Sequence, residues 1–337
     1  MKIQFRAVKL SKENRKKLDY INEIIEEYQN DGYVLTLRQL YYQLVSRDII
    51  PNNVSEYGKL STILKEGRMA GIVDWDAIED RLRQPYTPSA FDSPKNILDA
   101  CIQQYMLHRQ EGQDTYLEVW VEKDALSGVL KRVTSKYHVP ILVNRGYSSA
   151  SAMYDSYERF FKAIKNGQKV KILYLGDHDP SGEDMIRDIY DRSLEFLKGS
   201  EEVRNYMYFN DDNQDCYHRL SKYMDEKGLD EEFSLECVKD DLVSNIQFEV
   251  TPIALTKAQI RQYNPPPNPA KITDPRAKAY IERHGAVSWE VDALKPEVLH
   301  KLLEDNILAN IDLEKYEEIL DKEKEGITKL KALKPYL

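Results

Sequence analysis

Cysteine is scarce in this sequence. The chain of 337 residues has only Cys101, Cys216 and Cys237, and none of them belongs to a CxxC pair. An odd number of scattered cysteines supports neither a disulfide framework nor a zinc site. We therefore expect these three residues to be buried as small apolar side chains.

Long apolar runs are missing as well. No run approaches the roughly 18–20 residues that a membrane-spanning helix needs, although 42% of the residues are apolar. Residues 1–17 are basic but lack the apolar core of a signal peptide. The sequence thus predicts a cytoplasmic protein of prokaryotic or phage origin, with no membrane partner and enough residues for two or three domains.

The chain as a whole has no excess of basic residues. Its formal net charge is −9, which argues mildly against a nucleic-acid binder. The charge is uneven, however, because residues 1–73 hold 12 Lys or Arg against 9 Asp or Glu, and the remainder holds 36 against 48. A basic N-terminal module before an acidic body is compatible with a DNA-docking domain joined to a metal-binding one, but the difference is too small to decide alone.

Residues 1–88 have the pattern of three helices and a short β element. Residues 11–30 carry apolar side chains at helical spacing, Thr36 can cap a second helix, and residues 55–73 predict a third. Residues 72–75 are β-prone. This order is typical of a winged helix-turn-helix, which places its third helix in the major groove of DNA. A plain three-helix bundle fits the pattern equally well.

The third of these helices carries the candidate DNA contacts. Its apolar positions face inward, and its basic side chains face elsewhere. These basic residues are Lys59, Lys65 and Arg68.

The middle of the chain alternates strands with helices. Residues 84–94 are Pro-rich and a helix is expected at 95–110, so that residues 89–115 form a linker and a helix. Alternation over residues 116–260 predicts an α/β domain with a mainly parallel, Rossmann-like sheet. Residues 261–337 should begin as an extended Pro-rich surface segment and continue as a mainly helical extension. The expected strands are 116–121, 139–144 and 169–175, and the expected helices are 123–137, 149–167 and 181–199.

Three carboxylates follow the predicted strands directly. Glu122 follows the first strand, and Asp177 and Asp179 follow the third. The carboxyl ends of parallel strands meet at one edge of a sheet, and residues two apart in an extended segment point the same way. Clustered carboxylates repel each other unless a hard divalent cation joins them, and Mg²⁺ prefers such oxygen ligands. The sequence therefore predicts a Mg²⁺ site here, which Mn²⁺ could also occupy.

The residues around these carboxylates have predicted roles too. His178 should point to the opposite face and serve in packing or hydrogen bonding rather than as a ligand. Ser181 and Gly182 open the next helix, where free amides could contact a phosphate. Arg145, in RGYSS before another helix, is a further candidate DNA contact.

The segments VEKD and GDHDPSG, in this order with two crossovers between them, resemble the Toprim domain of topoisomerases, primases and old-type nucleases. In that family the glutamate is a general acid/base and the DxD pair binds Mg²⁺. The resemblance implies these roles for Glu122 and for Asp177 and Asp179.

LRQLYYQL (37–44) resembles the tyrosine motif of the topoisomerase VI A subunit and of the related meiotic double-strand-break transesterase. There an arginine precedes the catalytic tyrosine by four residues, in a winged helix N-terminal to Toprim. The resemblance implies that Tyr42 attacks a DNA phosphodiester and that Arg38 stabilises the developing charge. The family pattern commonly has aspartate where this chain has Gln39. The family also acts on double-stranded DNA as a homodimer, with a separate GHKL-type ATPase subunit for topoisomerase activity.

Three functions remain open at this stage. The first is Mg²⁺-dependent DNA cleavage through a phosphotyrosyl link, as in a type IIB topoisomerase. The second is a Toprim endonuclease that uses water, as in plasmid or phage defence. The third is a DNA-binding regulator without catalysis. Arg276, Glu290 and Asp292 are possible accessory site residues, although salt-bridged surface positions explain them better.

Overall fold

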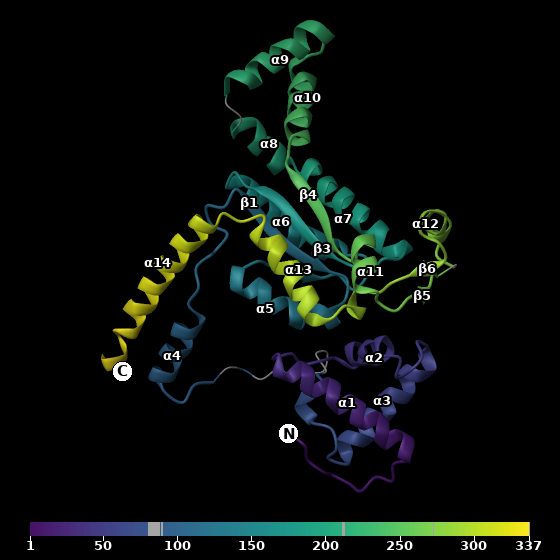
Figure 1. The fold of residues 1–337 in the computed structure, drawn as a ribbon. Coiled ribbons are helices and arrows are strands. Elements are labelled where there is room, and N and C mark those ends of the chain that lie inside the picture. Colours follow the sequence, from purple (N-terminus) through teal and green to yellow (C-terminus); the bar gives the residue numbers. More distant parts are fainter. Residues whose placement is uncertain (80–87, 89, 211–212, 272, 337) are drawn as a thin grey trace.

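The computed structural model describes residues 1–79, 88, 90–210, 213–271 and 273–336, with only the backbone described for residues 213–217. It is a mixed α/β structure in which helices surround a four-stranded parallel sheet. The N-terminal helices lie below the sheet in Figure 1, and the helices α8 to α10 lie above it. The predicted α/β class is therefore confirmed.

The first two N-terminal helices begin at the predicted caps, and the third is capped by Asn53. The Ser11 side chain accepts a hydrogen bond from the Asn14 amide, and Thr36 and Gln39 form a reciprocal capping box. Both caps satisfy amides that a helix leaves unpaired at its start. The elements are α1 (Lys12–Asn30), α2 (Leu37–Ser46), α3 (Val54–Met69) and the short 3-10 helix η1 (Trp75–Ala77).

The strand expected at residues 72–75 is not formed. Gly71 turns the chain with a φ of 70°, and the Asp74 side chain accepts a hydrogen bond from the Asp76 amide, which starts η1. The β-pairing near this segment consists of two isolated bridges, one between Ala70 and Gln4 and one between Ile78 and Leu35. Part of the adjoining segment, residues 80–87, lies outside the described residues, and the winged helix stays a prediction.

Helix α4 (Pro94–Gln104) is shorter than the helix expected at 95–110. It ends because Tyr105 leaves the helical path and lays its ring against Gly326 of α14. A side chain at Gly326 would collide with that ring. The predicted linker at 84–94 lies partly outside the described residues.

The expectation of buried cysteines is wrong for Cys101. Its side chain is exposed on α4, because this helix buries only Leu98. Cys237 on α10 is partly exposed, and the side chain of Cys216 lies outside the described part of the chain. A helix that buries few of its residues thus has exposed positions at which a cysteine can lie.

The sheet has the strand order β2-β1-β3-β4, with every neighbouring pair parallel. Val121 at the end of β1 pairs with both Val143 and Leu175, so three strands end at the same level. The three predicted strands are therefore confirmed, and β4 adds a fourth. The strands are β1 (Thr115–Val121), β2 (Ile141–Val143), β3 (Lys169–Leu175) and β4 (Phe248–Ala254).

Side chains alternate between two cores, one on each face of the sheet. Val119 and Leu173 pack in a core that includes residues of α5 and α13. Trp120 and Tyr174 point the other way, into a core with residues of α6 and α7. Burial of both faces explains why these strands are almost continuously apolar. The helices are α5 (Ser127–Tyr137), after the 3-10 turn η2 (Asp124–Leu126), α6 (Ala150–Lys165), α7 (Pro180–Gly199) and α13 (Pro296–Leu308).

Three helices lie between α7 and β4 in the sequence, and they extend away from the sheet (Figure 1). Val238 and Leu242 form a small core of their own there. The helices are α8 (Glu201–Asn210), α9 (Asn213–Lys227) and α10 (Glu231–Ser244).

The C-terminal part returns to the carboxyl edge of the sheet and then passes along α4 (Figure 1). The expected surface segment is partly buried, because Pro265 and Ala270 are covered and β5 pairs with β6. None of the described helices is long and apolar enough to cross a membrane. The elements are α11 (Lys257–Tyr263), β5 (Asn268–Pro269), α12 (Ala277–His284), β6 (Val287–Ser288), η3 (Val291–Ala293), α14 (Leu313–Lys331) and η4 (Lys334–Tyr336).

Helix α14 is fixed by a buried ion pair that makes stability depend on pH. Glu323 accepts hydrogen bonds from Arg109 at 2.7 Å and from the Leu107 amide at 3.0 Å. Burial opposes ionisation of Glu323, but these donors outweigh it and hold its pKa below the ordinary value. A lowered carboxyl pKa stabilises the fold above the unfolded pKa of about 4.3, and this stabilisation is lost as the pH falls further.

We therefore expect Glu323→Gln to lower the free energy of unfolding at pH 7 by about 3 kcal/mol. Below about pH 4 the difference from the unmodified protein should shrink. Urea titrations over this pH range measure both quantities. A constant difference at all pH values would contradict the assignment.

Candidate active site

The three predicted carboxylates lie at one edge of the sheet. The Glu122 amide donates to the Leu175 carbonyl at 2.9 Å, which continues the β1–β3 ladder past its last pair. The Asp177 amide donates to Glu122 Oε2 at 3.0 Å. This contact joins the ends of two different strands, so the expected convergence of Glu122 and Asp177 is present.

Asp177 is the most enclosed of the three carboxylates. Its Oδ1 accepts a hydrogen bond from the Val291 amide at 2.9 Å and pairs with Lys123 Nζ at 2.8 Å. Burial raises the pKa of Asp177, Lys123 opposes this effect and the charges of Glu122 and Asp292 add to it, which together bring the pKa to about 7. Burial likewise raises the pKa of Glu122. A bound cation would relieve this concentration of negative charge.

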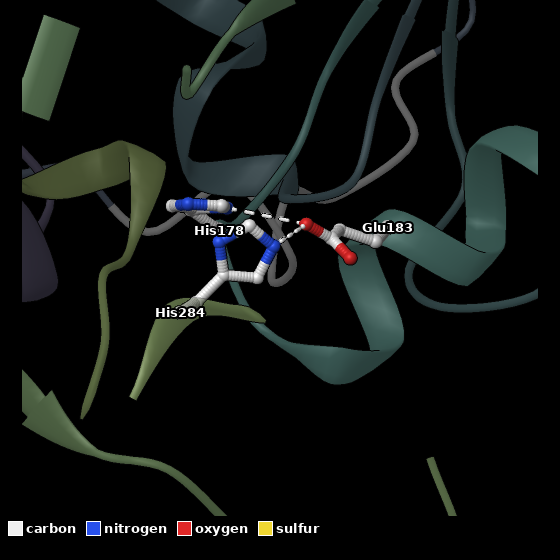
Figure 2. A group of neighbouring side chains, drawn as sticks. All are labelled: His178, Glu183 and His284. Atoms are coloured by element: carbon white, nitrogen blue, oxygen red, sulfur yellow. Dashed lines mark ion pairs between the residues drawn. The ribbon is translucent and has the colours of Figure 1, made fainter. Parts of the chain in front are cut away.

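His178 points away from this group, as expected. Its ring is buried and stacks on Trp289, and its backbone forms a two-bond β-bridge with the same residue at 2.8 and 3.0 Å. Burial lowers the pKa of His178, and the neighbouring His284 lowers it further. Figure 2 shows that His178 also faces Glu183 and His284, a group discussed below.

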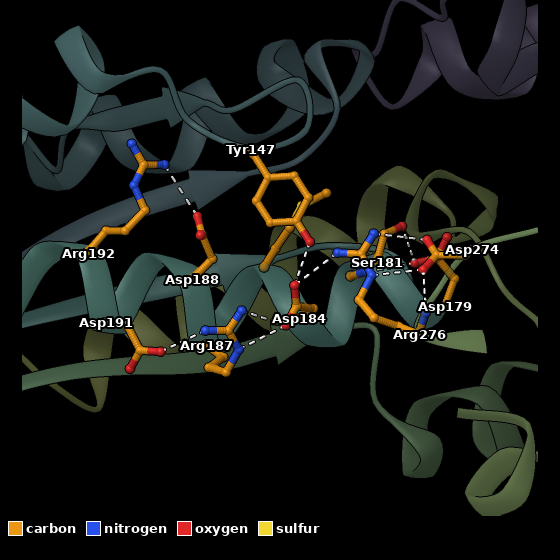
Figure 3. A network of polar contacts seen from close by, with 12 residues as sticks. Tyr147, Asp179, Ser181, Asp184, Arg187, Asp188, Asp191, Arg192, Asp274 and Arg276 are labelled. Atoms are coloured by element: carbon orange, nitrogen blue, oxygen red, sulfur yellow. Dashed lines mark hydrogen bonds and ion pairs between the residues drawn. The ribbon is translucent and has the colours of Figure 1, made fainter. Parts of the chain in front are cut away.

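Asp179 has a structural role at the start of α7. Its Oδ1 accepts hydrogen bonds from the Gly182 amide at 2.6 Å and from Ser181 Oγ at 2.8 Å (Figure 3). The Gly182 amide, proposed as a phosphate contact, is therefore occupied by Asp179. Gly182 has a different requirement, because a Cβ there would collide with the Asp177 carbonyl oxygen.

A pair of acidic residues after β6 connects the N-terminal helices to the sheet edge. Lys123 Nζ lies 2.8 Å from Glu290 and 2.9 Å from Asp292. Arg38 pairs with Glu290, and its Nε lies 2.7 Å from Asp292 Oδ2. We call Glu290 and Asp292, with the cations Arg38 and Lys123, the acidic bridge. All four residues thus form one ion-pair network.

The expectation of surface salt bridges at residues 290 and 292 is half right. Both residues are ion-paired, but the Asp292 side chain is fully buried and that of Glu290 is only 24% exposed. The reason is the fully buried Val291 between them, which draws the segment into the core.

Tyr42 reaches the same network through its hydroxyl. It donates a hydrogen bond to Glu290, and the Arg38 guanidinium lies 5.9 Å from the centre of its ring. Burial raises the pKa of Tyr42, and the charges of Glu290 and Asp292 add to the effect. Burial opposes the ionisation of Glu290, but Lys123, Tyr42 and Arg38 outweigh it and lower its pKa to about 2. The tyrosine is neutral and Glu290 is ionised at neutral pH.

Two of the predicted DNA contacts, Lys65 and Arg68, line one groove, and the other two lie elsewhere. Lys65 is exposed and lines a groove of about 500 Å³ between α3 and the turn after β1, which Arg38 also lines. Lys59 pairs with Glu56 on the surface of α3. Arg68 donates to two backbone carbonyls at 2.8 and 2.5 Å and supports η1. Arg145 is exposed, and its amide donates to the Glu122 carbonyl at the sheet edge.

Arg276, considered as an accessory site residue, is part of a separate ion-pair network (Figure 3). Its guanidinium contacts Asp274 at 2.8 Å and Asp184 at 2.9 Å and lies over the Tyr147 ring. Tyr147 donates to the same Asp184 carboxylate at 2.6 Å. The salt-bridged role expected for Arg276 is therefore present, and it joins the C-terminal part to α7.

Lys123 is a site residue that the sequence patterns do not reveal. It lies within VEKD, directly after Glu122, and its side chain is only 13% exposed. Burial opposes the charge of Lys123, but Asp292, Asp177 and Glu290 outweigh it and raise its pKa. Its position two residues after the end of a buried strand, next to a candidate metal ligand, is the signal that could have identified it.

The donor set fits a hard divalent cation in its chemistry. Three carboxylates, those of Asp177, Glu290 and Asp292, pair with Arg38 or Lys123, and carboxylate oxygens are the ligands that Mg²⁺ prefers. The three predicted ligands are not gathered into a tight cluster. In the part of the chain that the structure describes, only His178, Glu183 and His284 bring three ligand atoms within 4.8 Å of one another.

No protein-family model, no curated protein and no solved structure matches this chain.

Proposed function

We propose that this protein is a Mg²⁺-dependent enzyme that cleaves DNA strands, with a Toprim domain behind an N-terminal winged helix as in the topoisomerase VI A subunit. The acidic bridge is the observation that carries this proposal. It connects two groups of residues. Arg38 and Tyr42 belong to the motif that the resemblance links to nucleophilic attack, and Lys123 and Asp177 lie at the carboxyl edge of the sheet, where Mg²⁺ is proposed to bind. Residues chosen from two separate motifs therefore lie in one network.

Glu122, Asp177 and Asp179 are the residues that would hold Mg²⁺. When bound, the cation stabilises the negative charge that develops during phosphoryl transfer. Lys123 and Asp292 keep Asp177 in place, since Lys123 contacts both carboxylates. The role of Glu122 as general acid/base follows from the Toprim resemblance.

In the proposed reaction, the Tyr42 oxygen attacks a DNA phosphorus atom, a phosphotyrosyl bond forms and the bond to the deoxyribose oxygen breaks. The tyrosine proton leaves, and the released sugar oxygen takes up a proton. Arg38 stabilises the charge on the phosphate oxygens. Tyr42 is only 5% exposed and bonded to Glu290, so its contact with Glu290 has to open before DNA reaches the hydroxyl.

Water as the nucleophile is the second candidate function. The burial of Tyr42 favours it, because a hydroxyl that packs and donates to Glu290 can have a purely structural role. The protein would then be a Toprim endonuclease, and Arg38 and Tyr42 would hold the N-terminal helices against the sheet edge.

Covalent capture distinguishes the two nucleophiles. Labelled double-stranded DNA is incubated with the protein and Mg²⁺, and the protein is then denatured. We expect label to remain on the protein and Tyr42→Phe to abolish both capture and cleavage. Tyr41→Phe is the matched control, because the Tyr41 hydroxyl bonds to Asn52, outside the acidic bridge. Cleavage by Tyr42→Phe at the normal rate, without capture, would establish water as the nucleophile.

The partners follow from the proposed reaction. As the resemblance to the topoisomerase VI A subunit implies, we propose that the enzyme acts as a homodimer on double-stranded DNA. Strand passage would require a separate GHKL-type ATPase subunit.

A further inference from the structure

A second group of ligand-type side chains lies on the far side of the segment that carries Asp177 and Asp179. It consists of His178, Glu183 at the start of α7 and His284 at the end of α12. Glu183 Oε1 lies 2.6 Å from His284 Nε2 and 3.9 Å from His178 Nδ1. In Figure 2 both imidazole rings turn toward this one carboxylate.

The group is enclosed, and two of its ring nitrogens lack a polar partner. The His178 and His284 side chains are 8% and 10% exposed. His178 Nε2 and His284 Nδ1 are buried without a hydrogen bond among the described residues, and His284 Nε2 has its ion-pair contact with Glu183. A buried polar atom without a partner is costly, so two such nitrogen atoms beside a carboxylate indicate that something else binds this group.

The Glu183 carboxylate is oriented toward the two imidazole rings. Arg283 holds the second oxygen of this carboxylate, Oε2, at 2.8 Å, which leaves Oε1 between the two imidazoles. The backbone of His178 is equally fixed by its bridge to Trp289, and the Tyr280 hydroxyl donates to the His178 carbonyl at 2.8 Å. The Glu183 carboxylate and the backbone of His178 are thus both held in place by neighbouring residues.

We propose that His178, Glu183 and His284 bind a transition-metal cation of the Zn²⁺ class. Two imidazoles and one carboxylate are borderline ligands that suit Zn²⁺ better than Mg²⁺. The ligand atoms lie within 4.8 Å of one another, and tetrahedral Zn²⁺ needs about 3.3 Å between ligands. Binding would therefore move His284 Nε2 and Glu183 Oε1 apart from 2.6 Å and bring His178 Nδ1 closer to Glu183 Oε1 than 3.9 Å. The proposal is independent of the proposed DNA cleavage.

The cation would fasten the C-terminal part to the sheet. His284 belongs to α12, whereas Glu183 belongs to α7. Trp289, which pairs with His178, directly precedes Glu290 of the acidic bridge. A metal between these elements therefore fixes the segment from which Glu290 and Asp292 reach Lys123.

Zinc titration of the chelator-treated full-length protein tests this proposal. We expect one Zn²⁺ to bind per chain, to raise the melting temperature and to slow proteolysis of residues 264–290. His284→Asn and Glu183→Gln should each weaken Zn²⁺ binding at least tenfold. Co²⁺ should give the visible absorption of a tetrahedral site, and both variants should lose it.

Two controls separate this site from other metal binding. Asp177→Asn/Asp179→Asn should leave Zn²⁺ affinity unchanged, because neither residue belongs to the group. His300→Asn, on α13, should also bind as the unmodified protein does. Equal Zn²⁺ affinity in His284→Asn and Glu183→Gln, or Zn²⁺ binding no tighter than that of Mg²⁺, would overturn the proposal.

Discussion

Replacing Asp177 by asparagine is expected to lower the rate of Mg²⁺-dependent DNA cleavage at least about a thousandfold, because the cation contributes several kcal/mol to stabilising the reacting charge. Asparagine keeps the acceptor for the Val291 amide and leaves Lys123 its other two carboxylates. The fold should therefore remain intact. Nicking of supercoiled plasmid, followed over time, gives the rate.

Melting temperatures with and without Mg²⁺ provide a second readout for this variant. Binding to the folded state alone raises the melting temperature, so we expect a rise in the unmodified protein and none in Asp177→Asn. Asp188→Asn is the matched control, since Asp188 is an ion-paired aspartate farther along α7 (Figure 3). Unchanged cleavage in Asp177→Asn, or an equal Mg²⁺-induced rise, would refute the metal site.

The largest effect on stability is expected from Glu118→Ala in β1. Glu118 is fully buried and accepts hydrogen bonds from Arg159 at 2.6 and 3.0 Å, from Trp120 at 2.9 Å and from Tyr116 at 2.8 Å. Removing the carboxylate leaves three donor groups without their acceptor. We expect the free energy of unfolding to fall by about 3–5 kcal/mol. We expect a loss of about 3 kcal/mol rather than about 5 kcal/mol, because the Arg159 side chain is 36% exposed and can reach water.

Glu249→Ala in β4 is the control for this variant. Glu249 also belongs to the sheet and pairs with Lys171 at 3.2 Å, but its side chain is 60% exposed. Exposed pairs contribute at most about 1 kcal/mol. Urea unfolding curves of the two variants measure the contrast, and equal losses would show that burial of Glu118 adds nothing.

The positions of Glu122 and Asp177 at the carboxyl edge of the sheet could be predicted from the sequence, because they depend on where individual strands and helices begin and end. Strand ends follow from apolar runs and helix starts from caps such as Thr36, and parallel pairing brings the strand ends together. Glu122 and Asp177 therefore lie where the sequence placed them. The Toprim and winged-helix assignments remain predictions.

The acidic bridge was not predictable in the same way. Contacts between Arg38, Lys123 and Glu290 join parts of the chain that are far apart in sequence, and no local period encodes them. The edge strand β4 was not predicted either, because Glu249 and Pro252 interrupt its apolar pattern. An edge strand tolerates both, since one side of it has no pairing partner.

The acidic bridge also has a consequence for protein synthesis. A ribosome produces Arg38 and Tyr42 early, then Lys123 and Asp177, and Glu290 with Asp292 much later. Until residues 290–292 have left the ribosome, Lys123 has neither of these acidic partners and the N-terminal helices have no ionic connection to the sheet edge through Arg38. We therefore expect chains that end before residue 290 to hold their N-terminal helices less firmly against the sheet edge, which limited proteolysis of such chains would measure.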